Sequence, residues 1–196
     1  MSRQFAFHFD QRYCTGCMAC QIACKDKNDL PVGLHYRKVS EYSGGWYEMD
    51  PQTGAVVPHV HAFWLSASCH HCLKPSCVKV CPTDALFKRD EDGIVIVDPE
   101  ACIGCRQCEP ACPYGAIVFF EDRQKIGKCD FCLDLLEAGK EPICVSACPM
   151  RVLNDGDLQT LQAQYGTCSQ VPGLPDPDET RPSLVITPHR DAGCSI

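Results

Sequence analysis

The stretch between residues 34 and 65 consists of short apolar runs separated by turn residues. Leu34–Ser43, Trp46–Met49 and Val56–Leu65 are rich in β-branched and aromatic residues. Gly44-Gly45 and Asp50–Gly54, which separate these runs, are typical of turns. The pattern therefore predicts three strands and two turns, which together form a β-rich lobe inserted at residues 34–65.

The apolar runs elsewhere in the chain are also short and predict small elements. Gly93–Asp98 and Ala116–Phe120 have the length of single strands, whereas Cys17–Asn28 has helical spacing. Asp157–Tyr165 is predicted to be a short helix that begins with an aspartate cap. The tail from Val171 onward is rich in proline and is predicted to lie on a surface.

No apolar run approaches the roughly 18 residues that a membrane-spanning helix needs. Phe5–Phe9 is the apolar part of the N-terminus, and it is too short for a secretory signal. We therefore expect no direct membrane span, no export signal in this chain, and membrane contact only through a partner.

Composition changes this picture through one residue type. The chain has 196 residues, of which 18 are cysteine, and its formal net charge is −7. The negative charge argues against nucleic-acid binding. A chain of this length can bury a core without covalent cross-links, so we expect the cysteines to serve chemistry.

Sixteen cysteines form four quartets with regular spacing, and three of the quartets are followed directly by proline. The quartets are Cys14, Cys17, Cys20 and Cys24; Cys69, Cys72, Cys77 and Cys81; Cys102, Cys105, Cys108 and Cys112; and Cys129, Cys132, Cys144 and Cys148. The first and third share the spacing C-x2-C-x2-C-x3-C at an offset of 88 residues, and the second resembles the fourth. The chain therefore contains an internal duplication.

This spacing favours [4Fe-4S] clusters. Three thiolates within seven residues wrap the backbone around a bulky cluster and point its amides at the sulfur atoms. In two-cluster ferredoxins the fourth cysteine of each run binds the neighbouring cluster, so four runs predict four [4Fe-4S] clusters. The duplication alone allows the quartets to pair as one with two and three with four, or as one with four and two with three.

Two other uses of cysteine fit the pattern less well. Zinc ribbons join two separated cysteine pairs, whereas here two quartets place three cysteines within seven residues. A disulfide framework is typical of exported chains, and no signal peptide is expected. His70 and His71 lie inside the second quartet and are interpreted as packing or hydrogen-bonding residues.

The sequence contains no nucleotide-binding loop and no hydrolase or metalloprotease motif, so we predict electron conduction with no catalytic residue of its own. Sixteen thiolates and four cluster cores bring the expected net charge of the loaded chain to about −15. Cations near the ligands could then raise local potentials. The candidates are Lys25, Lys74, Lys79, Arg106, Lys128 and Arg151.

Over residues 4–190 the chain resembles the iron-sulfur (B) subunits of the dimethyl sulfoxide reductase family, within the complex iron-sulfur molybdoenzymes. The resemblance is carried most specifically by Lys79-Val80-Cys81-Pro82, Cys102-Ile103-Gly104-Cys105-Arg106, Ala111-Cys112-Pro113-Tyr114-Gly115-Ala116, Lys128-Cys129-Asp130 and Pro142-Ile143-Cys144-Val145. It implies a non-catalytic subunit of an oxidoreductase complex in anaerobic respiration. Electrons would pass from a menaquinol-oxidising integral membrane anchor to a molybdopterin-containing catalytic subunit that reduces dimethyl sulfoxide or a related oxide.

The resemblance also implies how the quartets pair. Quartet one would nest with quartet four, and quartet two with quartet three. The ligand sets would be Cys14, Cys17, Cys20 and Cys148; Cys129, Cys132, Cys144 and Cys24; Cys69, Cys72, Cys77 and Cys112; and Cys102, Cys105, Cys108 and Cys81. Nitrate-reductase relatives carry tryptophan at the place of Cys105 together with a three-iron cluster, so Cys105 favours four cubanes here.

The fold class implied is α+β, with two bacterial-ferredoxin-like modules, the inserted β-rich lobe and an extended C-terminal tail. Residues 1–33 and 122–153 would form the first module, residues 34–65 the lobe, residues 66–121 the second module, and residues 154–196 a short helix and the tail. Cys168 and Cys194 match no ligand of the family and are expected to be free thiols.

Such subunits fold in the cytoplasm and are exported with the catalytic subunit, which implies a peripheral location on the outer face of the cytoplasmic membrane. The equivalent subunit of a thiosulfate, polysulfide or tetrathionate reductase, of a hydrogenase or of a formate dehydrogenase is an alternative that the sequence leaves open. A free-standing polyferredoxin is another, and it would be stable alone, whereas a subunit wedged between partners should expose apolar patches.

Overall fold

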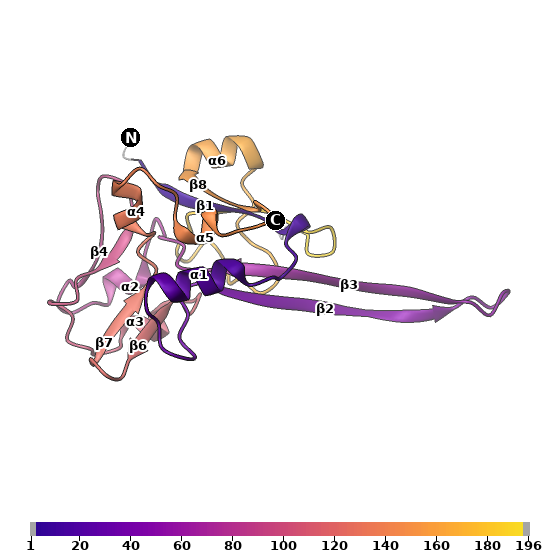
Figure 1. Ribbon diagram of the computed structural model, residues 1–196, viewed down its shortest axis with the longest axis horizontal. Helices are drawn as coiled ribbons and strands as arrows, with labels where there is room; N and C mark the ends of the chain where they lie inside the picture. The colour runs from indigo at the N-terminus through magenta and orange to yellow at the C-terminus, as the bar shows by residue number, and fades with distance from the viewer. Residues whose placement is uncertain (1–2, 194–196) are drawn as a thin grey trace.

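The computed structural model describes residues 3–193 and shows a small α+β body from which one long hairpin projects (Figure 1). The hairpin consists of β2 (Lys38–Met49) and β3 (Val56–Ala67), which pair antiparallel along their whole length. The turn predicted at residues 50–54 lies at its tip. The predicted Gly44-Gly45 turn is wrong, because β2 runs straight through both glycines, which pair with His61 and Val60. Gly45 lets the strands approach closely, since a Cβ there would lie 2.1 Å from the carbonyl oxygen of His59.

Two short hairpins and four short helices make up most of the cysteine-bearing body. The hairpins pair β4 (Leu86–Lys88) with β5 (Val95–Val97) and β6 (Ile117–Phe120) with β7 (Lys125–Lys128). The helices are α2 (Ser76–Lys79), α3 (Cys108–Ala111), α4 (Leu133–Glu137) and α5 (Ile143–Ser146). The strands predicted near residues 93–98 and 116–120 are therefore confirmed.

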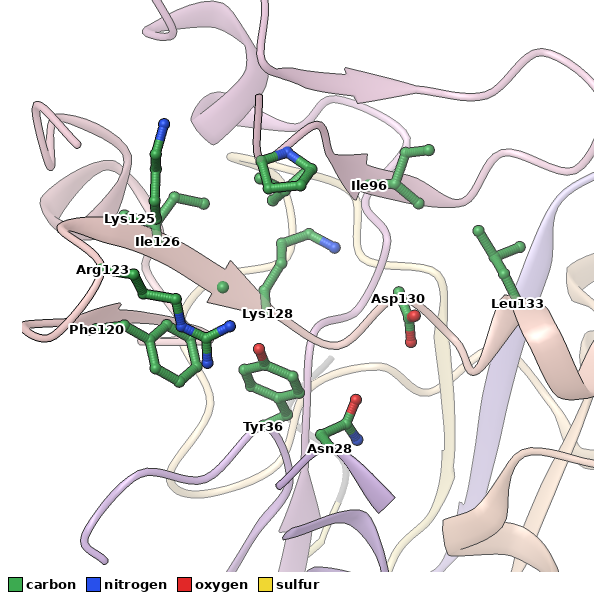
Figure 2. Close-up of a pocket in the computed structure, with 13 residues that line it drawn as sticks. Asn28, Tyr36, Ile96, Phe120, Arg123, Lys125, Ile126, Lys128, Asp130 and Leu133 are labelled. Carbon is green, nitrogen blue, oxygen red and sulfur yellow. The ribbon is translucent and has the colours of Figure 1, made fainter. Parts of the chain in front are cut away.

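A pocket with a mixed polar and apolar lining opens beside β7, and no cysteine lines it (Figure 2). Tyr36, Lys128 and Asp130 are among the residues around it. The Lys128 ammonium group donates hydrogen bonds to the carbonyl oxygens of Val95 and Cys129 and is buried. These bonds tie the end of β7 to β5.

The N-terminal and C-terminal segments meet in a three-stranded sheet with the order β8-β1-β9. β1 (Phe5–Asp10) pairs antiparallel with β8 (Leu153–Asp157) and parallel with β9 (Leu184–Thr187). The expectation that the tail lies on a surface is wrong for this part of it, because Val171 is 1 % exposed and Val185 is fully buried. The apolar run Leu184–Ile186 fills the free edge of β1, and this burial outweighs the proline-rich composition around it.

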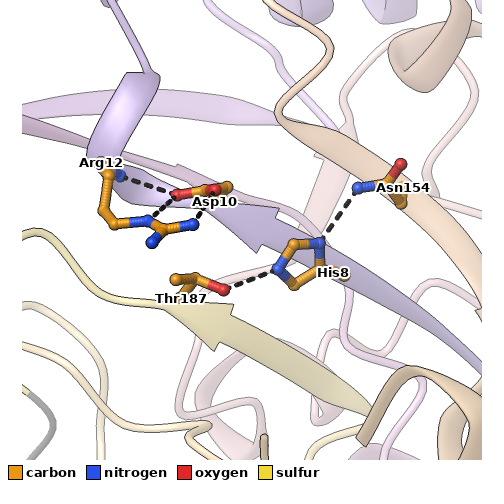
Figure 3. Close-up of polar contacts among 5 residues, drawn as sticks. All are labelled: His8, Asp10, Arg12, Asn154 and Thr187. Atoms are coloured by element: carbon orange, nitrogen blue, oxygen red, sulfur yellow. Dashed lines mark hydrogen bonds and ion pairs between the residues drawn. The ribbon is translucent and has the colours of Figure 1, made fainter. Parts of the chain in front are cut away.

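His8 ties the three strands together (Figure 3). The Asn154 amide donates to Nδ1 of His8 at 3.0 Å, and Nε2 of His8 lies 2.9 Å from the Thr187 hydroxyl oxygen. Burial lowers the pKa of His8 to about 4, so the ring is neutral at pH 7. At the end of β1, Arg12 forms an ion pair with Asp10 at 2.7 Å.

Helix α6 (Leu158–Tyr165) packs against β1 and β9. The Asp157 carboxylate accepts hydrogen bonds from the backbone amides of Gln159 and Thr160, which makes it the helix N-cap. The predicted helix over residues 157–165 is confirmed. The longest helix, α1 (Ala19–Lys27), follows a short 3-10 turn, η1 (Gln11–Tyr13), and continues for three residues beyond Cys24.

The main core lies between the sheet and the cysteine loops, and Phe131 is at its centre. Its ring is fully buried, stacks on Phe7 at 4.1 Å between ring centroids and meets the edges of Phe5 and His71. No helix among residues 3–193 is both long and apolar enough to cross a bilayer.

Candidate metal centres

The sixteen quartet cysteines are free thiols, and each of two apolar cavities is lined by four of them that come from two different quartets. We assign all sixteen to the four sets that the family resemblance implies. We call these sets sites A to D. Site A contains Cys14, Cys17, Cys20 and Cys148; site B contains Cys24, Cys129, Cys132 and Cys144; site C contains Cys69, Cys72, Cys77 and Cys112; and site D contains Cys81, Cys102, Cys105 and Cys108.

Sites A and D are each built around a cavity. All four thiols of site A line one apolar cavity together with Phe9 and Val39. All four thiols of site D line a second apolar cavity together with Ile103 and Ile126. In both, the fourth cysteine comes from a different quartet.

Sites B and C are assigned from the family resemblance, and the thiols assigned to each site act on one another's pKa values. Burial raises the pKa of Cys24 to about 12, Arg37 opposes this rise, and Cys144 and Cys132 add to it. In site C, burial raises the pKa of Cys77 to about 12, and Cys69 and Cys112 are among the groups that raise it. Thiols that disfavour each other's ionisation need a cationic core between them, which an iron-sulfur cluster supplies.

Backbone amides point at several of these sulfur atoms, as a cluster loop requires. Phe131 donates its amide to Cys129 at 3.4 Å, and Ala116 donates to Cys112 at 3.5 Å. For Cys81 burial acts to raise the pKa, but hydrogen bonds that include the amides of Leu86 and Thr83 lower it below the ordinary value.

Glycines with left-handed backbone shape the two loops of the first duplication. Gly16 and Gly104 stand between the first two cysteines of quartets one and three, with φ of +66° and +68°. A Cβ on Gly16 would lie 2.3 Å from the Trp64 indole nitrogen, and one on Gly104 would lie 2.1 Å from the carbonyl oxygen of Gln124. The duplicated glycines therefore serve the same backbone turn at sites A and D.

Within residues 3–193, no three or more Cys, His, Asp or Glu side chains are gathered closely enough to hold a single metal ion. The thiolates around a cubane stand further apart than those around one zinc ion, because four irons and four sulfides lie between them. The cavities, the inward amides and the all-thiol donor sets fit the larger group.

We order the four sites as a row, A-B-C-D, because packing contacts or the electrostatic influence of their thiols link each site to the next. Helix α1 carries Cys20 of site A and Cys24 of site B, and it packs against α5, which carries Cys144 of site B. Helix α2 carries Cys77 of site C, α3 carries Cys108 of site D, and these two helices pack against each other. Sites B and C are neighbours, because the charge of Cys69 acts on Cys129.

Exposure differs along the row. Cys17 in site A and Cys105 in site D are exposed, whereas all four thiols of site B are buried. The two end sites therefore reach the surface, and the sites between them lie deeper.

The charged groups nearest the thiols were only partly identified from the sequence. Of the six lysines and arginines expected to act there, Lys128 is buried, while Arg106 and Arg151 are exposed. Two further cations were not predicted from the sequence. Arg37 is buried, and the charges of thiols assigned to sites A and B raise its pKa. Lys88 donates a hydrogen bond to the carbonyl oxygen of Cys72 at 3.0 Å. Neither residue adjoins a cysteine in the sequence.

His70 and His71 are buried packing residues, as expected, and burial is the main cause that lowers the pKa of both rings, to about 3 for His70.

Cys168 is disulfide-bonded, so the expectation of a free thiol there is wrong. Cys194, the other leftover cysteine, lies outside the described residues.

Comparison with known proteins shows that the chain carries iron-sulfur domains. A 4Fe-4S dicluster domain matches residues 60–158, and a 4Fe-4S binding domain matches residues 13–33. The protein is 44% identical to the B subunit of anaerobic dimethyl sulfoxide reductase from Escherichia coli, over 98% of this chain and 92% of the relative. The corresponding subunit of Haemophilus influenzae is 42% identical, over 98% and 93%. The thiosulfate reductase electron transfer subunit of Salmonella typhi is 38% identical, over 84% and 81%. The protein therefore belongs to the family of iron-sulfur subunits that includes the B subunit of anaerobic dimethyl sulfoxide reductase.

Proposed function

We propose that the chain is an electron-transfer subunit that holds four [4Fe-4S] clusters, one in each of sites A to D. The observation that carries this proposal is that two apolar cavities are each lined by four free thiols from two different quartets, among sixteen free quartet thiols in all. Each cluster, when bound, supplies a carrier for one electron. The chain contributes the thiolates, the inward amides and the exclusion of water from the inner sites.

The two ends of the row are the proposed points of exchange with partners. Cys17 of site A and Cys105 of site D are both exposed, so an external donor and an external acceptor could each approach one of these sites. Sites B and C would then pass electrons only to neighbouring sites. This arrangement is typical of a relay and needs no catalytic residue in the chain.

The partners proposed are a molybdopterin-containing catalytic subunit and a membrane anchor that oxidises menaquinol. Relatives named as reductase subunits support this assignment. The β2–β3 hairpin supports it too, because its outer half exposes apolar side chains to an extent that is unusual for a solitary soluble chain. These side chains are Trp46, Tyr47, Met49, Val56 and Val60, each more than half exposed.

Dimethyl sulfoxide or a related oxide is the terminal substrate class we propose. Relatives with that activity in their names match nearly the whole chain at 42% to 44% identity, whereas the thiosulfate reductase subunit matches 84% of it at 38%.

We further propose that the chain works on the outer face of the cytoplasmic membrane after folding in the cytoplasm. The disulfide at Cys168 is typical of a chain that reaches an oxidising compartment. The sixteen quartet thiols must stay reduced while clusters are inserted, which favours assembly in the cytoplasm first.

The test is to express the chain with its neighbouring catalytic and anchor genes and to purify the complex anaerobically. We expect a menaquinol analogue to reduce the iron-sulfur signals and dimethyl sulfoxide to reoxidise them. Fully loaded clusters that menaquinol cannot reduce, or that dimethyl sulfoxide cannot reoxidise, would contradict the proposed relay. A chain that is stable, monomeric and fully loaded when expressed alone would favour a free-standing polyferredoxin instead.

A further inference from the structure

Arg37 is a cation buried between two of the proposed cluster sites. Its side chain lies in the segment before β2, and the residue is only 2 % exposed. Burial acts to lower its pKa, but the charges of nearby thiols raise it above the ordinary value. These thiols belong to both sites, with Cys20 from site A and Cys24, Cys129 and Cys144 from site B.

One of the three guanidinium nitrogens is hydrogen-bonded to the protein. Nη1 donates to the carbonyl oxygen of Ser66 at 3.2 Å and to its hydroxyl oxygen at 3.1 Å. The Ser66 hydroxyl in turn lies 3.4 Å from the sulfur of Cys20. The guanidinium carbon stands 4.7 Å from the centre of the Phe7 ring. These contacts fix the plane of the group beside site A.

The other two guanidinium nitrogens have no hydrogen-bond partner within the described chain. Nε and Nη2 are both buried and make no hydrogen bond to residues 3–193. No Asp or Glu in that range forms an ion pair with Arg37, although ten other ion pairs are formed there. A buried cation with unsatisfied donors costs several kcal/mol unless an anion faces it.

If the proposed function is right, the anion that faces Arg37 is an iron-sulfur cluster. A [4Fe-4S] core with four thiolates carries net negative charge, and hydrogen bonds to its sulfur atoms are one of the factors that set its potential. A planar guanidinium with several donors can serve two acceptors at once, which a lysine ammonium on its flexible stem does less well.

We propose that Arg37 is a positioning residue of the relay, whose guanidinium donates hydrogen bonds to cluster sulfur atoms at site A and site B and keeps both clusters more easily reduced. The inference rests on the proposed function, because it requires clusters at both sites. Because Arg37 is buried, its charge should act on the clusters more strongly than the charges of the surface cations, which solvent screens.

The test compares three variants in the purified anaerobic complex. Arg37→Met removes the charge and all the hydrogen-bond donors. Arg37→Lys keeps the charge but loses the planar set of guanidinium N–H donors. Arg12→Gln is the matched control, because Arg12 precedes Cys14 by two residues but is exposed and paired with Asp10. Iron and sulfide are assayed first, and each cluster is then titrated by EPR, with signals assigned through Cys20→Ser and Cys132→Ser.

We expect Arg37→Met to lower the ratio of reduced to oxidised cluster at a fixed potential about tenfold at sites A and B, which is about 59 mV for a one-electron couple. Sites C and D and the Arg12→Gln complex should stay close to the wild type. Arg37→Lys should show a smaller fall, about threefold, at one of the two sites at least.

Unchanged ratios in a fully loaded Arg37→Met complex would overturn the proposal, as would an equal shift in Arg12→Gln. If the Arg37→Met complex does not bind its clusters, the Arg37→Lys complex provides the test. Potentials at sites A and B in Arg37→Lys that equal those of the wild type would then count against the proposal. A wild-type complex that lacks clusters at sites A or B would instead contradict the proposed function, so the two failures are distinguishable.

Discussion

Replacement of Gly104 by alanine should loosen site D selectively. Gly104 has φ of +68°, and an added Cβ would lie 2.1 Å from the carbonyl oxygen of Gln124. The left-handed backbone alone costs an alanine about 1 to 2 kcal/mol. Displacement of the Gln124 backbone adds about 1 to 3 kcal/mol, in the range measured for overpacked sites.

Gly139 offers a matched control, because it has φ of +69° and no atom within 4 Å of an added Cβ. Gly139→Ala therefore carries the left-handed cost without the clash. The difference between the variants, about 1 to 3 kcal/mol, corresponds to a rate ratio of roughly 5 to 160.

The assay is the anaerobic release of iron to a chelator, followed through the EPR signal of site D and the loss of visible absorbance. We expect Gly104→Ala to lose the site D signal about five times faster than Gly139→Ala, or more. Equal rates in the two variants would refute the reasoning, because they would show that the close approach to Gln124 has no energetic consequence.

Three further predictions concern the ligand sets and the charge of the fold. Cys24→Ser should damage site B and leave site A intact, and EPR of the variant complex would contradict the pairing of quartets one and four if the site A signal disappeared instead. Cys105→Ala should damage site D and reduce menaquinol-driven turnover at least tenfold, and unchanged turnover would argue against an obligatory relay. Asp155→Asn should stabilise the loaded chain at neutral pH, because burial, with a contribution from Glu141, raises the pKa of Asp155 from 3.8 to about 6. The destabilisation caused by this carboxylate is absent below the unfolded pKa of 3.8 and grows as pH rises to about 6. The variant should therefore be about 1 kcal/mol more stable than the wild type above pH 6, discounted for partial exposure, and lose this gain below about pH 4. A difference in denaturation midpoint between variant and wild type that is the same at about pH 3.5 and about pH 7.5 would count against this prediction.

The sequence predicted most of what the cysteines do, because their spacing reflects the local geometry of the loops. The capped helix α6 and the tip of the β2–β3 hairpin were predictable for the same reason, since their signals lie within a few residues. The pairing of quartets was not determined by spacing, because quartet one could close locally on quartet two. Only the family resemblance indicated that quartet one pairs with quartet four. In the structure, Cys14 of quartet one and Cys148 of quartet four line the same cavity.

The features that were missed depend on contacts between distant segments. The edge of β1 that recruits Leu184–Ile186 lies almost the whole chain away from it, so composition alone assigned those residues to a surface tail. A Gly-Gly pair is compatible with a turn and with a closely paired strand. Only the pairing of Gly44 and Gly45 with β3 shows that they lie in a strand. Arg37 has no cysteine near it in the sequence, and its position between two sites follows from packing.

The most direct test of the account is the iron and acid-labile sulfide content of the chain in its anaerobically purified complex. Four [4Fe-4S] clusters predict about sixteen iron atoms and about sixteen sulfides per chain, in addition to those of any partner. A content near four zinc ions, or iron without sulfide, would contradict the central claim that sixteen thiolates hold four cubanes.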